Sequence, residues 1–220
     1  MNKRLLLPAI AMAITSFAVL SCKKDKPLTS ETTEVSTTKD GVIYTLDTAT
    51  SKVDWKSYKV FKTESTSHFG MIKFESGEVT VKDGKLESGK FVANMNTLEA
   101  VDLKDDAEQK GKLEGHLKSD DFFGVEANPK AMYEITKVTG STDGGDYNSI
   151  LDGNLTIKGI TKPVQFKANV SMNSGEVTIA TEPKDIMREE YGVKFQAPAE
   201  NGVVKDEITL QIFVKAAEVK

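Results

Sequence analysis

The chain has 220 residues, of which 39% are hydrophobic and 28% charged, and its formal net charge is −4 at pH 7. This length is enough for one well-cored domain. The acidic balance argues against nucleic acid and against electrostatic binding to anionic membranes, because both need a basic surface. The single cysteine excludes an internal disulfide.

Residues 1–21 have the features of an export signal. Lys3 and Arg4 precede an apolar run that ends at Leu20. As a helix this run would cover roughly 24 Å, short of the ~30 Å hydrocarbon core of a bilayer. A basic start and a short apolar core predict a cleaved signal rather than a permanent span. The run ends in Ser21-Cys22, which resembles a lipobox, so we expect a lipoprotein signal peptide and acylation of Cys22. An ordinary cleaved signal followed by a chance cysteine is the alternative.

The segment after the cysteine predicts a tether. Residues 23–41 contain Leu28 and Val35 as their sizeable apolar residues, too few to offset the entropy lost on ordering. We therefore expect residues 22–41 to be the acylated cysteine with a flexible tether, and residues 42–220 to be one domain. Lys23, by resemblance to lipoproteins in general, favours the outer membrane of the cell envelope, with the leaflet left open.

Alternation with a period of two dominates residues 42–220 and predicts strands with one buried face. The clearest strand is 164–172, which places Val164, Phe166 and Ala168 on one face, and the last strand, 208–216, repeats this pattern. We expect further strands near 43–46, 52–56, 68–74, 78–82, 91–95, 131–138, 150–158 and 176–181. Turn sequences such as Asn173-Ser174-Gly175 separate them.

Residues 98–118 break this alternation and are rich in helix formers. They predict a helical insertion that starts near Asn96 and Glu99 and is interrupted near Gly111. The fold class is therefore all-β, as a sandwich or a barrel, and alternation alone does not choose between the two. A closed barrel of about eight strands has room for packed side chains or for one small ligand.

Three stretches, taken together and in order, resemble the YceI-like family of bacterial lipid-binding proteins. The resemblance covers about residues 44–217, and Met187 stands before Arg188 where that family often has an aspartate. The stretches are Tyr44–Asp47 with Ser51–Trp55, then Gly115–Phe123 with Asn128–Ala131, then Gly153–Val164, and shorter similar words lie at Ser67–Ile72 and Arg188–Val193.

The resemblance implies an extended, lipocalin-like antiparallel β-barrel with a helix across one end. It also implies an interior that holds a long apolar ligand, such as a polyisoprenoid chain or a fatty acid or amide, without a cofactor. Burying apolar surface is worth about 25 cal/mol per Å², so we expect many weak contacts rather than a few strong ones. The expected lumen residues are Trp55, Phe69, Phe74, Phe91, Ala93, Met95, Leu117, Phe122, Phe123, Met132, Phe166 and Ala168.

The two histidines, His68 and His116, are candidates for contacting the head group of a ligand, or for fixing loops by hydrogen bonds. A metal site is not expected, because zinc needs three or four ligands and the chain has no further His or Cys except Cys22. We expect a lipid carrier, buffer or sensor, with its protein partners left open. The alternatives are an interaction module with a packed barrel and a hydrolase-type enzyme using either histidine, although no nucleophile–base–orienter set is visible.

Overall fold

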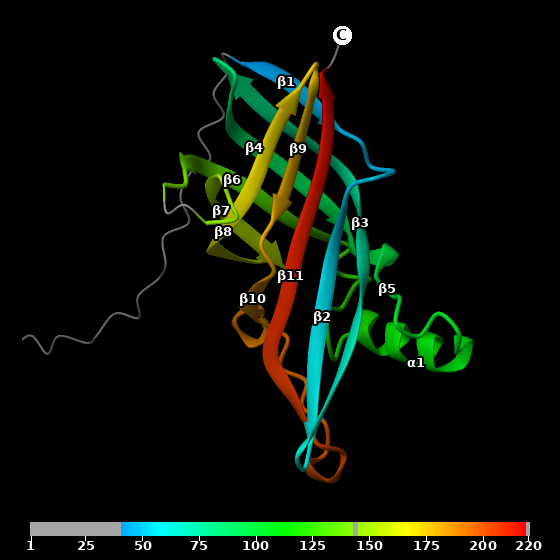
Figure 1. Cartoon of the computed structure of the whole chain (residues 1–220). Helices are drawn as coiled ribbons and strands as arrows, with labels where there is room; N and C mark the ends of the chain where they lie inside the picture. The colour runs from blue at the N-terminus through cyan, green and yellow to red at the C-terminus, as the bar shows by residue number, and fades with distance from the viewer. Residues whose placement is uncertain (1–40, 143–144, 219–220) are drawn as a thin grey trace, which may run out of the picture.

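The computed structural model describes residues 41–142 and 145–218 of the chain (Figure 1). The predicted signal peptide, Cys22 and nearly all of the predicted tether lie outside these residues. The strands are β1 (Val42–Leu46), β2 (Lys52–Phe61), β3 (Glu64–Lys82), β4 (Lys85–Asn94), β5 (Glu99–Ala100), β6 (Lys130–Gly140), β7 (Ser149–Ile157), β8 (Ile160–Asn173), β9 (Glu176–Thr181), β10 (Lys184–Met187) and β11 (Val203–Glu218). The helices are α1 (Ala107–Lys118) and the short 3-10 turns η1 (Met95–Thr97), η2 (Arg188–Tyr191) and η3 (Ala199–Asn201).

Within the described residues the strands form one antiparallel sheet that closes into a ring of eight. The ring runs β11-β2-β3-β4-β6-β7-β8-β9 and returns to β11. Five of the eight neighbouring pairs in the ring are successive in the chain: β2–β3, β3–β4, β6–β7, β7–β8 and β8–β9. In all of these except β6–β7 a two-residue turn connects the two antiparallel strands. The expected all-β, lipocalin-like barrel is confirmed.

Two positions in the ring are each occupied by two successive strands. β1 and β2 both lie against β3 and β11, with Tyr44 opposite Val79 and Val53 opposite Ile72. Ser51 marks the break between them, where its hydroxyl oxygen accepts a 2.9 Å hydrogen bond from the Lys215 amide. β9 and β10 likewise pair with successive parts of β11. The barrel is therefore longer than most of its single strands.

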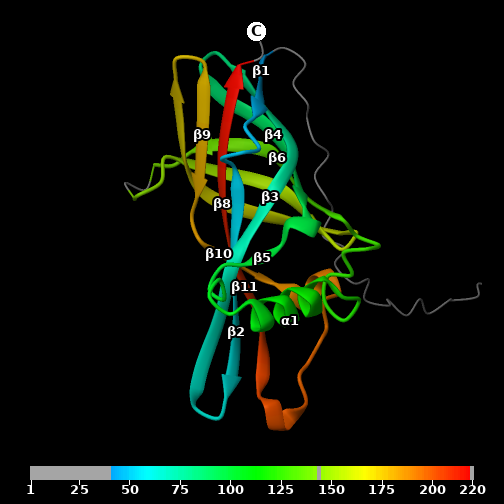
Figure 2. The ribbon, with the colours of Figure 1, turned by 90° about the vertical axis from the view of Figure 1, so that its right-hand side faces the viewer.

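The sheet is completely paired at one end of the barrel and incompletely paired at the other. β10 pairs with β11, and no ladder within the described residues joins it to β8. β3 pairs with β4 from Phe74 onward, and before that point its partner on this side is the two-residue strand β5. At the lower end in Figure 1, α1 and the segments after β10 stand where strands would otherwise close the wall (Figures 1 and 2).

We call the fully paired half the packed end. It lies toward β1 and the last residues of β11, at the top of Figure 1. Inward side chains fill it, and most of them are almost completely buried. They include Leu46, Val79, Val81, Ile135, Leu151, Phe166, Ala168, Val177, Ile179, Val214 and Ala216.

Two aromatic rings form a floor across the barrel below the packed end. The ring of Phe91 lies over Gly77 and Gly89, where an added Cβ would come within 2.9 and 3.1 Å of it. The ring of Tyr133 lies over Gly153, where a Cβ would approach it to 2.5 Å. Glycines at these strand positions therefore leave the space that two large rings need in a barrel of this width.

The helical insertion is confirmed, but its start differs from the prediction. Asp106 caps α1 by accepting from the amide of Gln109 at 3.0 Å, and the preceding residues form η1 and β5 instead of helix. The expected interruption near Gly111 is wrong, because α1 continues through this exposed position to Lys118. None of the helices in the described residues is long and apolar enough to cross a membrane.

Candidate functional site

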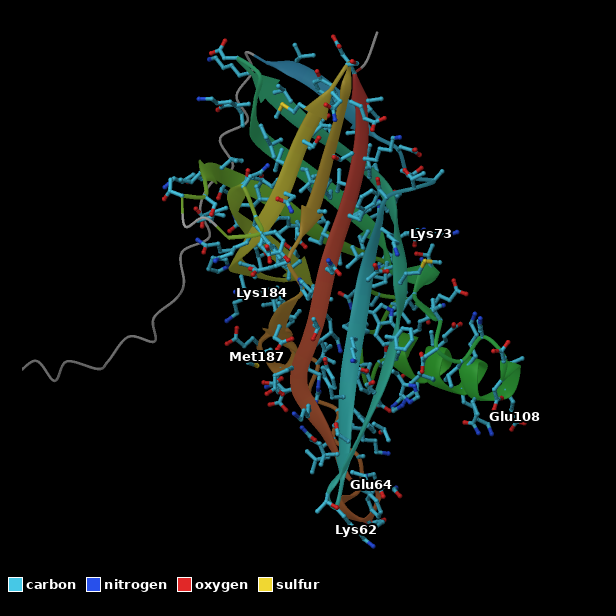
Figure 3. The ribbon with its side chains drawn as sticks, viewed as in Figure 1. Lys62, Glu64, Lys73, Glu108, Lys184 and Met187 are labelled. Atoms are coloured by element: carbon cyan, nitrogen blue, oxygen red, sulfur yellow. The ribbon has the colours of Figure 1, made fainter. Side chains whose placement is uncertain are left out.

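A cavity of about 410 Å³ occupies the other half of the barrel, which we call the hollow end. It begins at the floor and extends toward the β2–β3 hairpin, where Figure 3 labels Lys62 and Glu64. Its size falls within the range of about 300–1,000 Å³ that small-molecule sites have. The central wall residues are Val53, Trp55, Ile72, Phe74, Phe91, Tyr133, Leu155, Ile186, Tyr191, Val193, Ile208, Leu210 and Ile212.

Strand alternation points these side chains inward. On β2 the inward positions are Val53, Trp55, Ser57 and Lys59, and all four line the cavity. Leu210 of β11 lies opposite Trp55 in the ladder. Every second residue of a strand faces the same side. Since the inward residues of β2 are Val and Trp first and Ser and Lys last, the cavity wall changes from apolar to polar toward the hairpin.

Trp55 contributes the indole ring of the chain's one tryptophan to the wall. The ring lies against Gly70 of β3, where an added Cβ would be 2.8 Å from it. Its N–H is buried without a hydrogen-bond partner in the described part of the chain.

The helix and the turn that follows it cover one side of the cavity. Leu113, His116 and Leu117 of α1 line it, together with Phe122 and Phe123. The ring centroids of His116 lie 5.0 Å from Phe122 and 4.5 Å from Phe195, both in edge-to-face geometry. These aromatic contacts pack the cover onto the segment that follows η2.

Arg188 holds the segment after β10 against β11. Its side chain is 1% exposed, and its guanidinium donates hydrogen bonds to the carbonyl oxygens of Val193, Val204 and Lys205. The pairing of β11 with β2 shifts register between Val204 and Ile208, so this part of β11 has carbonyls that the ladder leaves unpaired. The guanidinium satisfies them and supplies a positive charge to the cavity wall.

His68 is held by a carboxylate. Its Nδ1 lies 2.7 Å from Oδ2 of Asp102, and Oδ1 of Asp102 accepts from the Phe69 amide at 3.1 Å. Ser57 is the cross-strand neighbour of His68, but no hydrogen bond joins its hydroxyl to the imidazole among the described residues. The pair resembles a base with an orienting carboxylate, and hydrolysis would in addition require Ser57 to close onto it.

Two phenols in the cavity wall have raised pKa values. Burial, with a smaller contribution from Asp152, raises the pKa of Tyr133 well above its ordinary value. Burial and then Glu190 raise the pKa of Tyr191 in the same way. The Tyr133 hydroxyl donates to the carbonyl oxygens of Leu151 and Val164 at 3.0 and 3.1 Å, so it braces the floor.

Most of the predicted lumen residues line the cavity, and their contact with a ligand stays a prediction. The residues that line it are Trp55, Phe74, Phe91, Ala93, Met95, Leu117, Phe122, Phe123 and Met132, with both head-group candidates, His68 and His116. The two histidines have different partners, an aspartate for one and aromatic rings for the other.

The structure places three predicted lumen residues elsewhere. Phe69 is 47% exposed on the outer face, because it follows the inward His68 and successive strand residues point to opposite faces. Phe166 and Ala168 do face inward, but they lie in the packed end and do not line the cavity. Alternation identifies a face, and it does not show whether that face meets a packed or an empty interior.

Several wall residues were not singled out from the sequence. Ile208, Leu210 and Ile212 carried a usable signal, since the alternation of the last strand already put them on one face. Val193 and Phe195 follow η2 in an irregular segment with no period to detect. Within the described residues no group of three His, Cys, Asp or Glu side chains could hold a metal ion.

Comparison with known proteins gives a family match over nearly all of the described residues. The YceI-like domain matches residues 44–216. A UPF0312 protein of Pseudomonas aeruginosa is 46% identical over 55 residues, which is 25% of this chain and 27% of that protein, so the aligned part spans about a quarter of the relative's length.

Two solved structures share the fold at low sequence identity. BcnA of Burkholderia cenocepacia aligns with a TM-score of 0.59 and 20% identity, over 78% of this chain and 99% of that one. A polyisoprenoid-binding domain from Saccharophagus degradans, implicated in plant cell wall breakdown, aligns with a TM-score of 0.56 and 13% identity, over 81% and 99%. These likenesses establish the barrel architecture.

Proposed function

The chain belongs to the YceI-like family, and from that premise we propose that it binds a long apolar ligand in the hollow end of its barrel. The observation that carries the proposal is the cavity itself, which is enclosed by aromatic and aliphatic side chains from eight or more elements. The polyisoprenoid-binding domain with the same fold supports a lipid as the ligand class. A carrier, a buffer and a lipid sensor would all use such a site.

The apolar wall explains how such a ligand would be held. A flexible hydrocarbon chain gains about 25 cal/mol for each Å² removed from water, and it needs no polar partner inside the protein. The alternative of a fully packed, ligand-free interaction barrel requires a filled interior, and the described residues leave about 410 Å³ empty. A polyisoprenoid and a fatty acid or amide remain as ligand classes.

Native mass spectrometry tests this proposal directly. Residues 23–220 would be exported to the periplasm without the acylated cysteine, and the intact mass would be compared with an organic extract of the same sample. We expect an adduct of a few hundred daltons that the extract releases and identifies. An apo mass that persists after incubation with envelope lipids would contradict the proposal, and a stoichiometric protein partner would then favour the interaction module.

We further propose that the protein is exported and anchored to the outer membrane by acyl chains on Cys22. The basic start, short apolar run and Ser21-Cys22 sequence support this. Several acyl chains on one residue bind a membrane much more firmly than one chain does. Labelled palmitate should enter the full chain and remain absent from a Cys22→Ser variant. Equal labelling of both, or recovery of the wild type in the soluble periplasm, would refute the anchor.

A further inference from the structure

The charged side chains that line the cavity are all basic. Lys59, Arg188 and Lys205 line it together with two histidines, and no Asp or Glu does so within the described residues. The chain as a whole has more acidic residues than basic ones, 33 against 29. A cationic lining therefore does not follow from composition.

Two of these cations have no anion beside them. The ammonium groups of Lys59 and Lys205 make no ion pair and no hydrogen bond in the described part of the chain. The Lys205 ammonium lies 5.8 Å from the ring centroid of Tyr58. Ion-paired lysines are common elsewhere on this domain, for example Lys110 with Glu99 at 2.6 Å. Lys59 and Lys205 differ from these in forming no ion pair among the described residues.

The carboxylates close to the cavity are bonded to other groups. Asp102 accepts from His68 and from a backbone amide. Glu189 accepts from Gln196 at 2.9 Å and lies 3.8 Å from Arg188. Asp206 accepts from the Glu189 amide at 2.8 Å. None of these three carboxylates forms an ion pair with Lys59 or Lys205.

The unpaired cations lie where the cavity meets solvent. Lys59 lies opposite Val204 in the ladder, and Lys205 is the next residue of β11. Lys59 is half-buried and Lys205 is exposed, and both line the end of the cavity that is close to the hairpin tip, which Lys62 and Glu64 mark in Figure 3. Ser57 and Asn201 add neutral polar groups to the same part of the lining.

We propose that the ligand is an anionic amphiphile, with a carboxylate or phosphate head group at Lys59 and Lys205 and its tail extending toward Phe74 and Phe91. This rests on the proposed lipid-binding function and adds the sign of the head group. Hydrogen bonds between an ammonium and an anion are about twice as strong as neutral ones. The low dielectric of an apolar wall also strengthens attraction to a nearby charge. The hydroxyl of Ser57 and the amide of Asn201 supply further donors for the same head group.

Acidic residues lie on the same elements but outside the cavity lining, so the preference for an anion is expected only inside the cavity. Glu64, Glu200 and Glu207 lie on β3, η3 and β11, and none of them lines the cavity. The surface around the opening therefore carries both signs, while the opening itself carries one. We expect a preference for an anionic head group on a single bound molecule, without general adhesion to anionic bilayers.

Three probes with the same 16-carbon tail and different head groups distinguish the effect of head-group charge from the binding of the apolar tail. The lipid-free protein, residues 23–220, would be titrated with palmitate, palmitamide and hexadecyl phosphate at mildly alkaline pH. We expect either anionic probe to bind about 10-fold more tightly than palmitamide. A Lys59→Gln/Lys205→Gln variant should lose most of that preference while its affinity for palmitamide changes less than about 2-fold.

The control is Lys62→Gln, which removes the same charge from the same hairpin at a residue outside the cavity lining. It should keep the full preference, and retained palmitamide binding by the double variant shows that the barrel is folded. Equal affinity of the wild type for all three probes, or an undiminished preference in the double variant, would overturn the anionic ligand and leave lipid binding intact. Failure of every probe to bind would contradict the proposed function itself.

Discussion

The two ends of this barrel are built from the same strands and have opposite interiors. At the packed end, β1 and β9 complete the hydrogen-bonded ring, and side chains such as Phe166 and Val214 fill the space within it. At the hollow end no ladder in the described residues joins β8 to β10, and a helix, a turn and an irregular segment form the wall. Stability is therefore expected to reside at one end and ligand binding at the other.

The difference between the two interiors follows from where the strands form a closed hydrogen-bonded ladder. A closed ladder draws the walls together until inward side chains interdigitate at the density of a protein interior. At the hollow end loops and a helix replace part of the ladder, and the inward side chains leave a cavity of about 410 Å³. A second, smaller cleft lies on this seam between β8 and β10, lined by Val164, Gln165 and Lys184 among others.

The largest expected effect comes from truncating one phenylalanine at each end. Phe166→Ala, at a residue with no exposed surface, should lower the free energy of unfolding by about 3–5 kcal/mol. Phe74→Ala should cost less, about 2 kcal/mol, because one side of that ring already borders the cavity and has fewer contacts to lose. Urea unfolding of both variants measures the difference.

Ligand affinity should respond in the opposite order. Phe74→Ala should weaken palmitamide binding, and Phe166→Ala should leave the affinity of the folded fraction unchanged. Equal stability losses together with equal affinity losses would show that the two ends do not divide these roles.

The second largest effect is expected at Arg188, whose hydrogen bonds stabilise the hollow end. Arg188→Met keeps much of the side-chain volume but leaves the carbonyls of Val193, Val204 and Lys205 without their donor. Because buried unsatisfied carbonyls are costly, we expect a loss of about 2–4 kcal/mol in urea unfolding. Arg188→Lys should recover only part of it, since an ammonium cannot reproduce the guanidinium fork. A loss under about 1 kcal/mol for the Met variant would indicate that water replaces the donor.

The sequence was a good guide to strands and inward faces and a poor guide to which inward faces enclose a cavity. Phe91 and Phe166 have the same alternating context, but Phe91 forms the floor of the cavity and Phe166 packs above it. Whether an inward residue is packed or borders the cavity depends on whether the ladder beside it is complete. The ladder is incomplete where the short strands β5 and β10 lie, which have two and four residues. Strands this short show no period.

Strand irregularities were a second limit. The register of β3 against β4 shifts between Phe74 and Ser76, so the inward positions change from even to odd residues along one strand. Val79 and Val81 then point inward at the packed end, as His68 and Ile72 do at the hollow end. A single strand pattern cannot be extended through such a bulge.

A smaller effect is expected from adding volume at each end. Ala168→Trp fills a site with no free space and should lower the stability by about 1–3 kcal/mol. Ala93→Trp places its ring in the cavity, so it should prevent palmitamide binding with a stability loss below about 1 kcal/mol. Thermal unfolding and ligand titration of both variants decide this. Retained binding by the Ala93 variant would mean that the cavity is not where the ligand lies.

The smallest effect concerns how firmly α1 covers the hollow end. Lys110 of α1 bonds Glu99 of β5 at 2.6 Å, and Glu114 accepts from the Ala100 amide at 2.9 Å. The hydrogen bond from Lys110 lowers the pKa of Glu99 below its ordinary value of 4.5. A carboxylate whose pKa is lower in the folded protein than in the unfolded chain stabilises the fold at pH values above the pKa of the unfolded chain. This contribution is lost as the pH falls through the pKa of the folded protein.

We therefore expect palmitamide, whose own charge does not change with pH in this range, to leave the wild-type protein about two- to five-fold faster once the pH falls below the pKa of Glu99. Lys110→Gln should show the faster release already at neutral pH. Lys112→Gln is the control, because Lys112 pairs with Glu108 on the exposed face of the same helix and does not touch β5. If stopped-flow release is the same for all three proteins at every pH, α1 is a fixed wall, and the ligand must enter and leave past Lys59 and Lys205 without movement of the helix.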